Sequence, residues 1–201
     1  NGTQVIAYDA SGGSYAARLW WVLRWLGHDS VAVLDGGWGA WTAEERTTDN
    51  AVPTPAATAF HVNLRPQMAV DATMVAKAIV DRSHILLDAR AADRFRGENE
   101  TIDPLGGHIP TAHNAVWTGN LGSDGRFLPA QLLRDRFAAA LPEGLNEQTE
   151  IIAYCGSGVT AAHNLLALEI AGIEGACLYP GSWSEWITDP ERPVAVGAQP
   201  G

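Results

Sequence analysis

The chain has 201 residues, of which 46% are hydrophobic, so it is long enough to bury the core of one or two domains. A formal net charge of −10 argues against nucleic acid or an anionic membrane as a partner, and no apolar run reaches the length of a membrane span. Two cysteines are too few for a disulfide framework and fit no zinc-binding spacing. We therefore expect no metal, no cofactor and a reducing, cytoplasmic location.

The first 41 residues contain a strand, a helix and a second strand. Residues 5–9 (VIAYD) have the β-branched and aromatic character of a buried strand, and a helical pattern covers residues 15–26. A second strand is predicted at residues 31–34, followed by a turn rich in glycine and tryptophan at residues 36–41. This order predicts parallel strands joined by a right-handed crossover.

Residues 47–59 (TTDNAVPTPAATA) have two prolines, small polar residues and no hydrophobic periodicity, which is typical of a linker. Asp71 is predicted to cap a helix that runs to residue 79, and residues 84–88 (HILLD) are predicted as a buried strand. A long polar loop with several arginines follows, and a further helix is predicted near residues 129–140.

Residues 151–171 contain the feature most suggestive of chemistry. A strand at residues 151–154 ends at Cys155, which is followed by a turn with Gly156 and Gly158 and then by a helical pattern. Cys155 should therefore face backbone N–H groups and the positive end of a helix dipole, where a thiolate is stabilised. The alternative is a small buried hydrophobic residue, but packing alone does not explain a cysteine before a Gly-x-Gly turn.

The stretch around Cys155 repeats the first part of the chain. Asp9 stands where Cys155 stands, Gly27 corresponds to Gly172, and the GGW turn at residues 36–38 corresponds to GSW at residues 181–183. A constant spacing between such landmarks indicates an internal repeat. About 95 residues precede Cys155 from position 60 onward, whereas eight precede Asp9. We therefore expect residues 1–46 to be the C-terminal part of a first domain whose front is missing, residues 47–59 a linker, and residues 60–201 a complete α/β domain with a central parallel sheet.

The motif at residues 155–161 (CGSGVTA) resembles the active-site loop of the tandem-domain rhodanese sulfurtransferases, and among them the mercaptopyruvate variant. Supporting motifs lie at residues 88–97 (DARAADRFRG), 107–110 (GHIP) and 181–186 (GSWSEW). The resemblance implies two rhodanese-like domains, each a central parallel sheet flanked by helices, with the first one inactive because it carries Asp9.

The resemblance also implies the chemistry. A sulfane sulfur would pass from 3-mercaptopyruvate or thiosulfate to Cys155, and from the resulting persulfide to cyanide or a thiol, with thioredoxin as one candidate acceptor. The loop residues that would hold the persulfide and the donor are Gly156, Ser157, Gly158, Val159 and Thr160. The Thr160 hydroxyl could instead cap the helix.

Arg94 matches the family's arginine that binds the anionic group of the donor, a task that suits a planar guanidinium. Arg90 and Arg96 are expected to be structural, pairing with Asp88 or the loop backbone. Mercaptopyruvate enzymes with a longer loop carry a second arginine where this chain has residues 98–103 (ENETID), so the donor carboxylate is left with one anchor.

Ser157 favours mercaptopyruvate as the donor. Thiosulfate-preferring relatives have basic residues at the two positions after the cysteine, where this chain has Gly156 and Ser157. A mercaptopyruvate donor needs a proton as its sulfur departs, and the serine hydroxyl is assigned that catalytic role by the resemblance. Of the remaining candidates, His108 is expected to be structural, His163 a packed or capping imidazole, and Cys177 inert.

Three alternatives stay open at this point. The main activity could be transfer from thiosulfate to cyanide. A cysteine phosphatase on a similar fold would need an arginine six residues after the cysteine, where this chain has Ala161. A non-catalytic binding or regulatory module is the third, because the first repeat shows that the fold does not require a cysteine.

Overall fold

The computed structural model describes residues 2–54, 56–141 and 150–201. Its first part contains, in order, β1 (Val5–Ala7), α1 (Ser14–Trp25), β2 (Val31–Val33) and α2 (Gly37–Ala43). The second part contains the 3-10 helix η1 (Pro66–Met68), α3 (Ala72–Asp81), β3 (Ile85–Asp88), α4 (Ala92–Arg96), β4 (His113–Asn114), the 3-10 helix η2 (Trp117–Asn120), α5 (Ala130–Ala140), β5 (Ile151–Tyr154), α6 (Val159–Ile170), β6 (Cys177–Leu178) and α7 (Ser182–Trp186).

The strands form two parallel sheets. β1 pairs with β2, and the larger sheet has the order β4-β3-β5-β6 with every neighbouring pair parallel. Leu87 of β3 lies opposite Ala153 of β5, so the carboxyl ends of these central strands meet at the same edge. The predicted α/β class with a central parallel sheet is confirmed.

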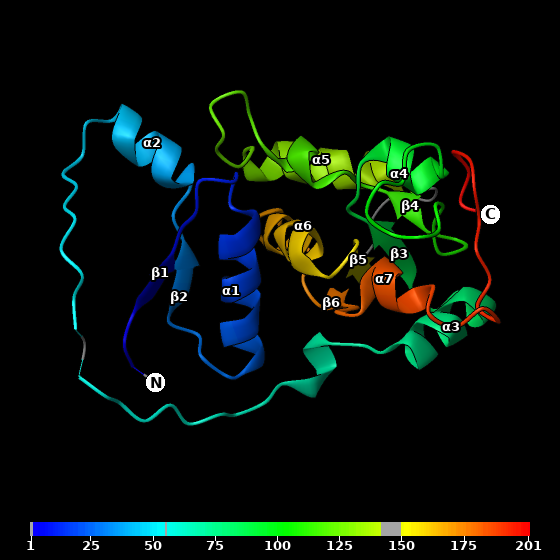
Figure 1. The fold of residues 1–201 in the computed structure, drawn as a ribbon, viewed down its shortest axis with the longest axis horizontal. Coiled ribbons are helices and arrows are strands. Elements are labelled where there is room, and N and C mark those ends of the chain that lie inside the picture. The colour runs from blue at the N-terminus through cyan, green and yellow to red at the C-terminus, as the bar shows by residue number, and fades with distance from the viewer. Residues whose placement is uncertain (1, 55, 142–149) are drawn as a thin grey trace.

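Alternate residues of β5 enter two different hydrophobic cores. Ile151, Ala153 and Cys155 belong to a core that includes residues of α1, α5 and α6. Ile152 and Tyr154 belong to a second core, formed with residues of α3 and α7. Successive side chains of a strand point to opposite faces, and a parallel sheet needs both faces covered. The result is a three-layer arrangement with β5 near its centre (Figure 1).

Helix α1 joins the first part of the chain to the second by packing against α6, and the two helices lie side by side in Figure 1. Trp20 of α1 and Leu165 of α6 are buried in one shared core, and Arg24 forms an ion pair with Glu169 beside it. Residues 47–54 and 56–59 are exposed and form no helix or strand, and the chain here follows the outside of the molecule (Figure 1). The two parts are therefore held together by helix packing.

The repeat predicted from sequence is visible in the backbone. The amide of Trp38 donates to the carbonyl of Asp9 at 2.9 Å, and the amide of Trp183 donates to the carbonyl of Cys155 at 3.0 Å. Gly37 and Ser182, the residues just before the tryptophans, have φ angles of +54° and +55°. The Gly-Trp segments were predicted as turns, but they begin the short helices α2 and α7.

Other predictions need correction where short elements form. Arg94 lies in α4, a helix of five residues, although a polar loop was expected there. β4, η1 and η2 were not predicted, because two to four residues are too few to show a periodic pattern.

The predicted cap of α3 is present, because the Asp71 side chain accepts a hydrogen bond from the amide of Met74 at 2.9 Å. Replacing Asp71 by Ala should lower the free energy of unfolding by about 1 kcal/mol, since one amide of the first turn loses its partner. Urea unfolding monitored by circular dichroism measures this, with Asp71→Asn as a control that keeps a capping oxygen. An alanine variant as stable as the parent would contradict the role of the cap.

Candidate active site

Cys155 lies at the carboxyl end of β5 and is 2% exposed. Its Sγ atom accepts a hydrogen bond from the amide of Gly158 at 3.1 Å, and its own amide donates to the hydroxyl of Ser182 at 3.1 Å. Gly158 has a φ of +77°, and a Cβ there would lie 2.8 Å from the carbonyl oxygen of Pro180. Glycine is therefore required at 158. Gly156 has no positive φ, so the turn uses the conformational freedom of glycine at Gly158 and not at Gly156.

The sulfur atom opens onto a cavity of about 540 Å³. Its walls come from both parts of the chain: Ser14 and Tyr15 of α1, the segment around Arg90 and Arg94, Ile102 and Asp103, Trp117, Ser184, and the loop residues Cys155, Gly156, Ser157, Val159 and Thr160. The cavity thus brings together the predicted site residues except Gly158, which is buried beneath it. Ser157 is exposed at the cavity, and Thr160 is half-buried there. The residue that caps α6 is Gly158, without a side-chain capping bond.

Arg94 lies at the cavity but its guanidinium already has partners. Nε and Nη2 donate to the carboxylate of Glu100 at 2.9–3.1 Å, and Nη2 also donates to Asp103 at 3.2 Å. The two Nη atoms lie 3.8 and 3.9 Å from where a Cβ of Gly156 would stand. The arginine therefore lies next to the cysteine loop, as predicted. Its pairing with the carboxylates of Glu100 and Asp103 was not predicted from the sequence.

Arg90 is buried, in keeping with the expected structural role. Its side chain donates to both oxygens of Asp88 at 2.6–3.1 Å and to the carbonyl of Gly107 at 2.6 Å, and its guanidinium lies 4.7 Å from the Trp183 ring centroid. Burial lowers the pKa of Arg90, but the charge of Asp88 more than offsets it, so the pKa is raised. Arg96 is half-exposed and pairs with Glu98.

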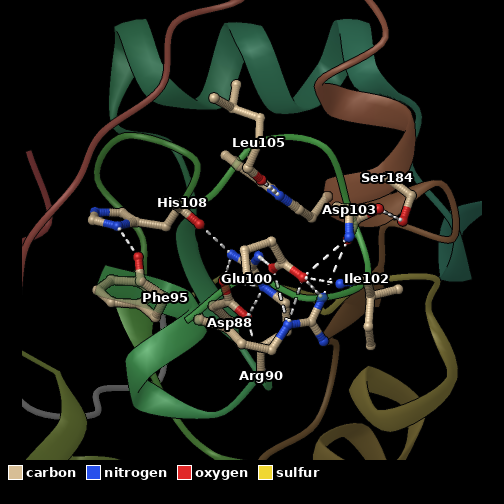
Figure 2. Close-up of polar contacts among 12 residues, drawn as sticks. Asp88, Arg90, Phe95, Glu100, Ile102, Asp103, Leu105, His108 and Ser184 are labelled. Atoms are coloured by element: carbon tan, nitrogen blue, oxygen red, sulfur yellow. Dashed lines mark hydrogen bonds and ion pairs between the residues drawn. The ribbon is translucent and has the colours of Figure 1, made fainter. Parts of the chain in front are cut away.

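The remaining candidates lie away from the sulfur atom. His108 is fully buried, bonds the carbonyl of Phe95 at 2.8 Å and stacks on the Phe95 ring at 3.7 Å (Figure 2). Cys177 donates to the carbonyl of Gln67 at 3.2 Å, and burial raises the pKa of its thiol. Both arrangements fit structural residues.

In the first repeat, the loop that corresponds to the cysteine loop binds the carboxylate of Asp9 through backbone amides. Its carboxylate accepts hydrogen bonds from four backbone amides, those of Ser11, Gly13, Tyr15 and Ala16, at 2.7–2.9 Å. Burial raises the pKa of Asp9, but these four amides more than offset it, and the pKa is lowered. The sequence predicted the position of Asp9 but not this cradle of donors.

Arg18 is a residue that sequence reasoning missed. It lies on α1, its guanidinium is 4.9 Å from the Trp21 ring centroid, and Nη1 donates to the carbonyl of Gly158 at 3.4 Å. Burial lowers the pKa of Arg18, and the nearby charge of Cys155 acts in the opposite direction. The first repeat therefore places a positive charge near the cysteine. The repeat offset offered a signal, because Arg18 falls at the position of His163.

In the described parts of the chain, no cluster of three or more His, Cys, Asp or Glu side chains is arranged to hold a metal ion. The helices found in residues 2–54, 56–141 and 150–201 are all too short or too polar to span a membrane.

Comparison with known proteins identifies related chains. The profile of the rhodanese-like domain family matches residues 1–44 and 71–189. A protein of Pseudomonas aeruginosa named probable 3-mercaptopyruvate sulfurtransferase is 50% identical over 196 residues, which cover 97% of this chain and 68% of the relative. The crystal structure of SseA from Escherichia coli, a 3-mercaptopyruvate sulfotransferase with the rhodanese fold, has a TM-score of 0.77 at 36% identity and covers 91% of this chain and 68% of SseA.

The chain spans only part of these relatives. It covers about two thirds of the two proteins above and 51% of EanB, whose structure in complex with ergothioneine matches with a TM-score of 0.86 at 24% identity. That last likeness shows a shared fold and nothing more.

His163 supplies a pH-dependent contribution to stability. The imidazole is fully buried. Its Nδ1 accepts from the side-chain amide (Nδ2) of Asn120 at 3.0 Å, and its Nε2 donates to the carbonyl of Gly12 at 3.1 Å. Burial lowers its pKa from 6.5 to about 4. Between these values the unfolded chain binds a proton that the folded chain does not, so acidification from pH 7 to 4 should cost roughly 3 kcal/mol of stability at this site.

The measurement is urea unfolding at pH 7, 5 and 4 for the parent and for His163→Gln, which does not titrate. Other groups titrate in both proteins, so the difference between the two curves isolates His163. We expect the parent to lose stability faster than the variant over this range; parallel curves would rule the contribution out.

Proposed function

This chain is a sulfurtransferase of the rhodanese family, and we propose that it takes the thiol sulfur of 3-mercaptopyruvate onto Cys155, where it becomes the outer sulfur of a persulfide, and passes it to a thiol or cyanide acceptor. The observation that carries the proposal is the sulfur atom of Cys155 itself. It lies at a strand end, 3.1 Å from the amide of Gly158, in a cavity that also contains Arg94.

In the first step the Cys155 thiolate attacks the sulfur of mercaptopyruvate. The S–S bond forms as the C–S bond breaks, and the electron pair of that bond leaves on the enolate of pyruvate. The enolate takes a proton, for which the exposed hydroxyl of Ser157 in the same cavity is the proposed donor. In the second step an acceptor thiol or cyanide attacks the outer sulfur, and Cys155 returns to its thiolate form.

The persulfide between these steps is an anion and needs hydrogen-bond donors. The Asp9 carboxylate provides an internal comparison, because the amides of Gly13, Tyr15 and Ala16 that donate to it correspond to those of Gly158, Thr160 and Ala161. We infer that these three amides hold the persulfide, with Gly158 donating to Sγ and Thr160 and Ala161 to the terminal sulfur, in the way that an oxyanion hole holds a developing charge. The wider loop from Gly156 through Val159 shapes the wall of the cavity.

Arg94 is the proposed anchor of the donor carboxylate. Its guanidinium is adjacent to Gly156, within reach of a small molecule whose sulfur contacts Cys155. Gly156 and Ser157 are uncharged, which supports mercaptopyruvate over the dianion thiosulfate. Sulfur transfer from thiosulfate to cyanide remains the second candidate activity. A phosphatase is not favoured, because Ala161 is fully buried and has no charge to bind phosphate.

We also propose the domain organisation and the setting of the reaction. Residues 1–46 would form part of a rhodanese-like unit without a catalytic cysteine, residues 47–59 a linker, and residues 60–201 the catalytic domain. The separate matches of the family profile to residues 1–44 and 71–189 support this division. Thioredoxin is a suitable acceptor because it presents a reactive thiol, and a cytoplasmic location would keep Cys155 reduced.

Treatment of the protein with mercaptopyruvate alone should leave one extra sulfur atom on Cys155. Intact mass spectrometry should show an increment equal to one sulfur, which an added thiol removes. Cys155→Ala should show neither the increment nor turnover, while Cys177→Ala should behave like the parent. An increment that persists in Cys155→Ala would overturn the proposal.

Ser157→Ala tests the proton donor. We expect kcat with mercaptopyruvate to fall about 100-fold, at the lower end of what a positioned acid contributes, with little change in KM. Ser83→Ala is the control, because Ser83 is exposed, precedes β3 and does not line the cavity. If kcat with mercaptopyruvate were unchanged in Ser157→Ala, Ser157 would have no part in proton transfer.

A further inference from the structure

We propose that Glu100 and Asp103 determine donor specificity, by setting the charge of the cavity so that it accepts a singly charged donor and disfavours a dianion. This inference rests on the proposed sulfur transfer, because it concerns which donor reaches Cys155. Neither residue was singled out in the sequence, where the segment was noted only for lacking a second arginine.

Glu100 lies at the centre of the contacts (Figure 2). Its side chain is 5% exposed. One oxygen accepts from Nη2 of Arg94 at 2.9 Å and from the amides of Ile102 and Asp103 at 2.9 and 3.1 Å. The other accepts from Nε of Arg94 at 2.9 Å and lies 3.5 Å from Nη1 of Arg90. A carboxylate of the protein therefore occupies the face of two arginines that an anionic ligand would otherwise use.

Asp103 is the second carboxylate that contacts the guanidinium of Arg94. One of its oxygens accepts from Nη2 of Arg94 at 3.2 Å, and the other accepts from the hydroxyl of Ser184 at 2.7 Å. Ser184 and Asp103 both line the cavity. No residue in the described parts of the chain accepts a hydrogen bond from Nη1 of Arg94, so this nitrogen is available to a donor.

The arginines and carboxylates around Glu100 have a net negative charge, although two of them are arginines. Two arginines, Arg90 and Arg94, face three carboxylates, Asp88, Glu100 and Asp103, so the cluster carries one net negative charge. Burial raises the pKa of Glu100, but Arg94 and the two loop amides more than offset it, and the pKa is lowered. Glu100 is therefore ionised at neutral pH.

The consequence differs for the two donors. Mercaptopyruvate carries one negative charge and thiosulfate two, so the field of Glu100 and Asp103 opposes thiosulfate about twice as strongly. Removing one of these charges should favour both donors, and thiosulfate more. Glu100 and Asp103 also hold the guanidinium of Arg94 in place. Its Nη1 is then positioned to bind the one carboxylate of mercaptopyruvate.

The first experiment measures kcat/KM for both donors in Glu100→Gln and Asp103→Asn. Each variant should raise the ratio of the thiosulfate value to the mercaptopyruvate value by roughly 5- to 10-fold, the effect of one unit charge a few ångström away in a partly solvated site. The matched control is Glu98→Gln in the same loop, because Glu98 is exposed and pairs with Arg96, which does not line the cavity. A ratio that stays constant in Glu100→Gln and Asp103→Asn, or that rises equally in the control, overturns the inference.

The second experiment does not depend on sulfur transfer. The thiolate of Cys155 displaces iodide from iodoacetate, which is an anion, or from iodoacetamide, which is neutral, and peptide mass spectrometry follows each rate. The ratio of the iodoacetate rate to the iodoacetamide rate should rise about fivefold in Glu100→Gln, as expected for one lost negative charge. The iodoacetamide rate shows whether the cavity is intact, and the ratio at Cys177 serves as an internal control.

The two experiments separate the two failures. If no variant transfers sulfur but the alkylation ratio at Cys155 rises in Glu100→Gln, the charge effect holds and the proposed function fails. If both donors are turned over by the parent and the alkylation ratio does not move, the proposed function stands and the specificity role of Glu100 is wrong.

Discussion

The packing of α1 against α6 is the interaction on which the site depends. The two helices occupy equivalent positions in the repeat, and each reaches across to the loop of the other. Nη1 of Arg18 on α1 donates to the carbonyl of Gly158, and Nε2 of His163 on α6 donates to the carbonyl of Gly12. The two donors, Arg18 and His163, occupy equivalent positions of the repeat, and their acceptors lie in the two equivalent loops one residue out of register, so these bonds hold the two loops against each other. Because α1 is held there, Ser14 and Tyr15 can form part of the wall around the cysteine.

One backbone frame holds two different groups in the two repeats. Gly13 and Gly158 each precede a helix with φ near +80°, and the carbonyls of Asp9 and Cys155 each accept from the amide of a tryptophan. In the first repeat the side chain itself supplies a permanent anion that fills the ring of amides. In the second, the cysteine sulfur accepts from the amide of Gly158. Under the proposed mechanism a second sulfur atom on Cys155 would accept from the other amides of this loop, which makes the Asp9 carboxylate the counterpart of the proposed persulfide.

The sequence predicted those features that local patterns encode, and missed those that arise from distant contacts. The short apolar run of β5, the cap at Asp71 and the repeat offset are visible in short windows, so the sheet and the position of Cys155 followed from them. Arg94 and Glu100 are six residues apart, and the pairing reaches from α4 into an irregular loop that carries no periodic signal. Arg18 lies more than a hundred residues from Gly158, and its role depends on helix packing that no window contains.

The arrangement around Arg94 combines two effects that cannot be separated by changing the arginine alone. A bidentate carboxylate fixes the plane of a guanidinium, so Glu100 both orients Arg94 beside Gly156 and reduces its attraction for a donor. In a protein of net charge −10, a strongly positive cavity would attract many small anions without selection. With both arginines paired, recognition of the proposed donor would depend on the shape of the cavity and on Nη1 of Arg94, for which the described residues supply no hydrogen-bond acceptor. Replacing a carboxylate by its amide removes the negative charge while keeping an oxygen that can accept from the guanidinium, so it changes the attraction for a donor more than the orientation of Arg94.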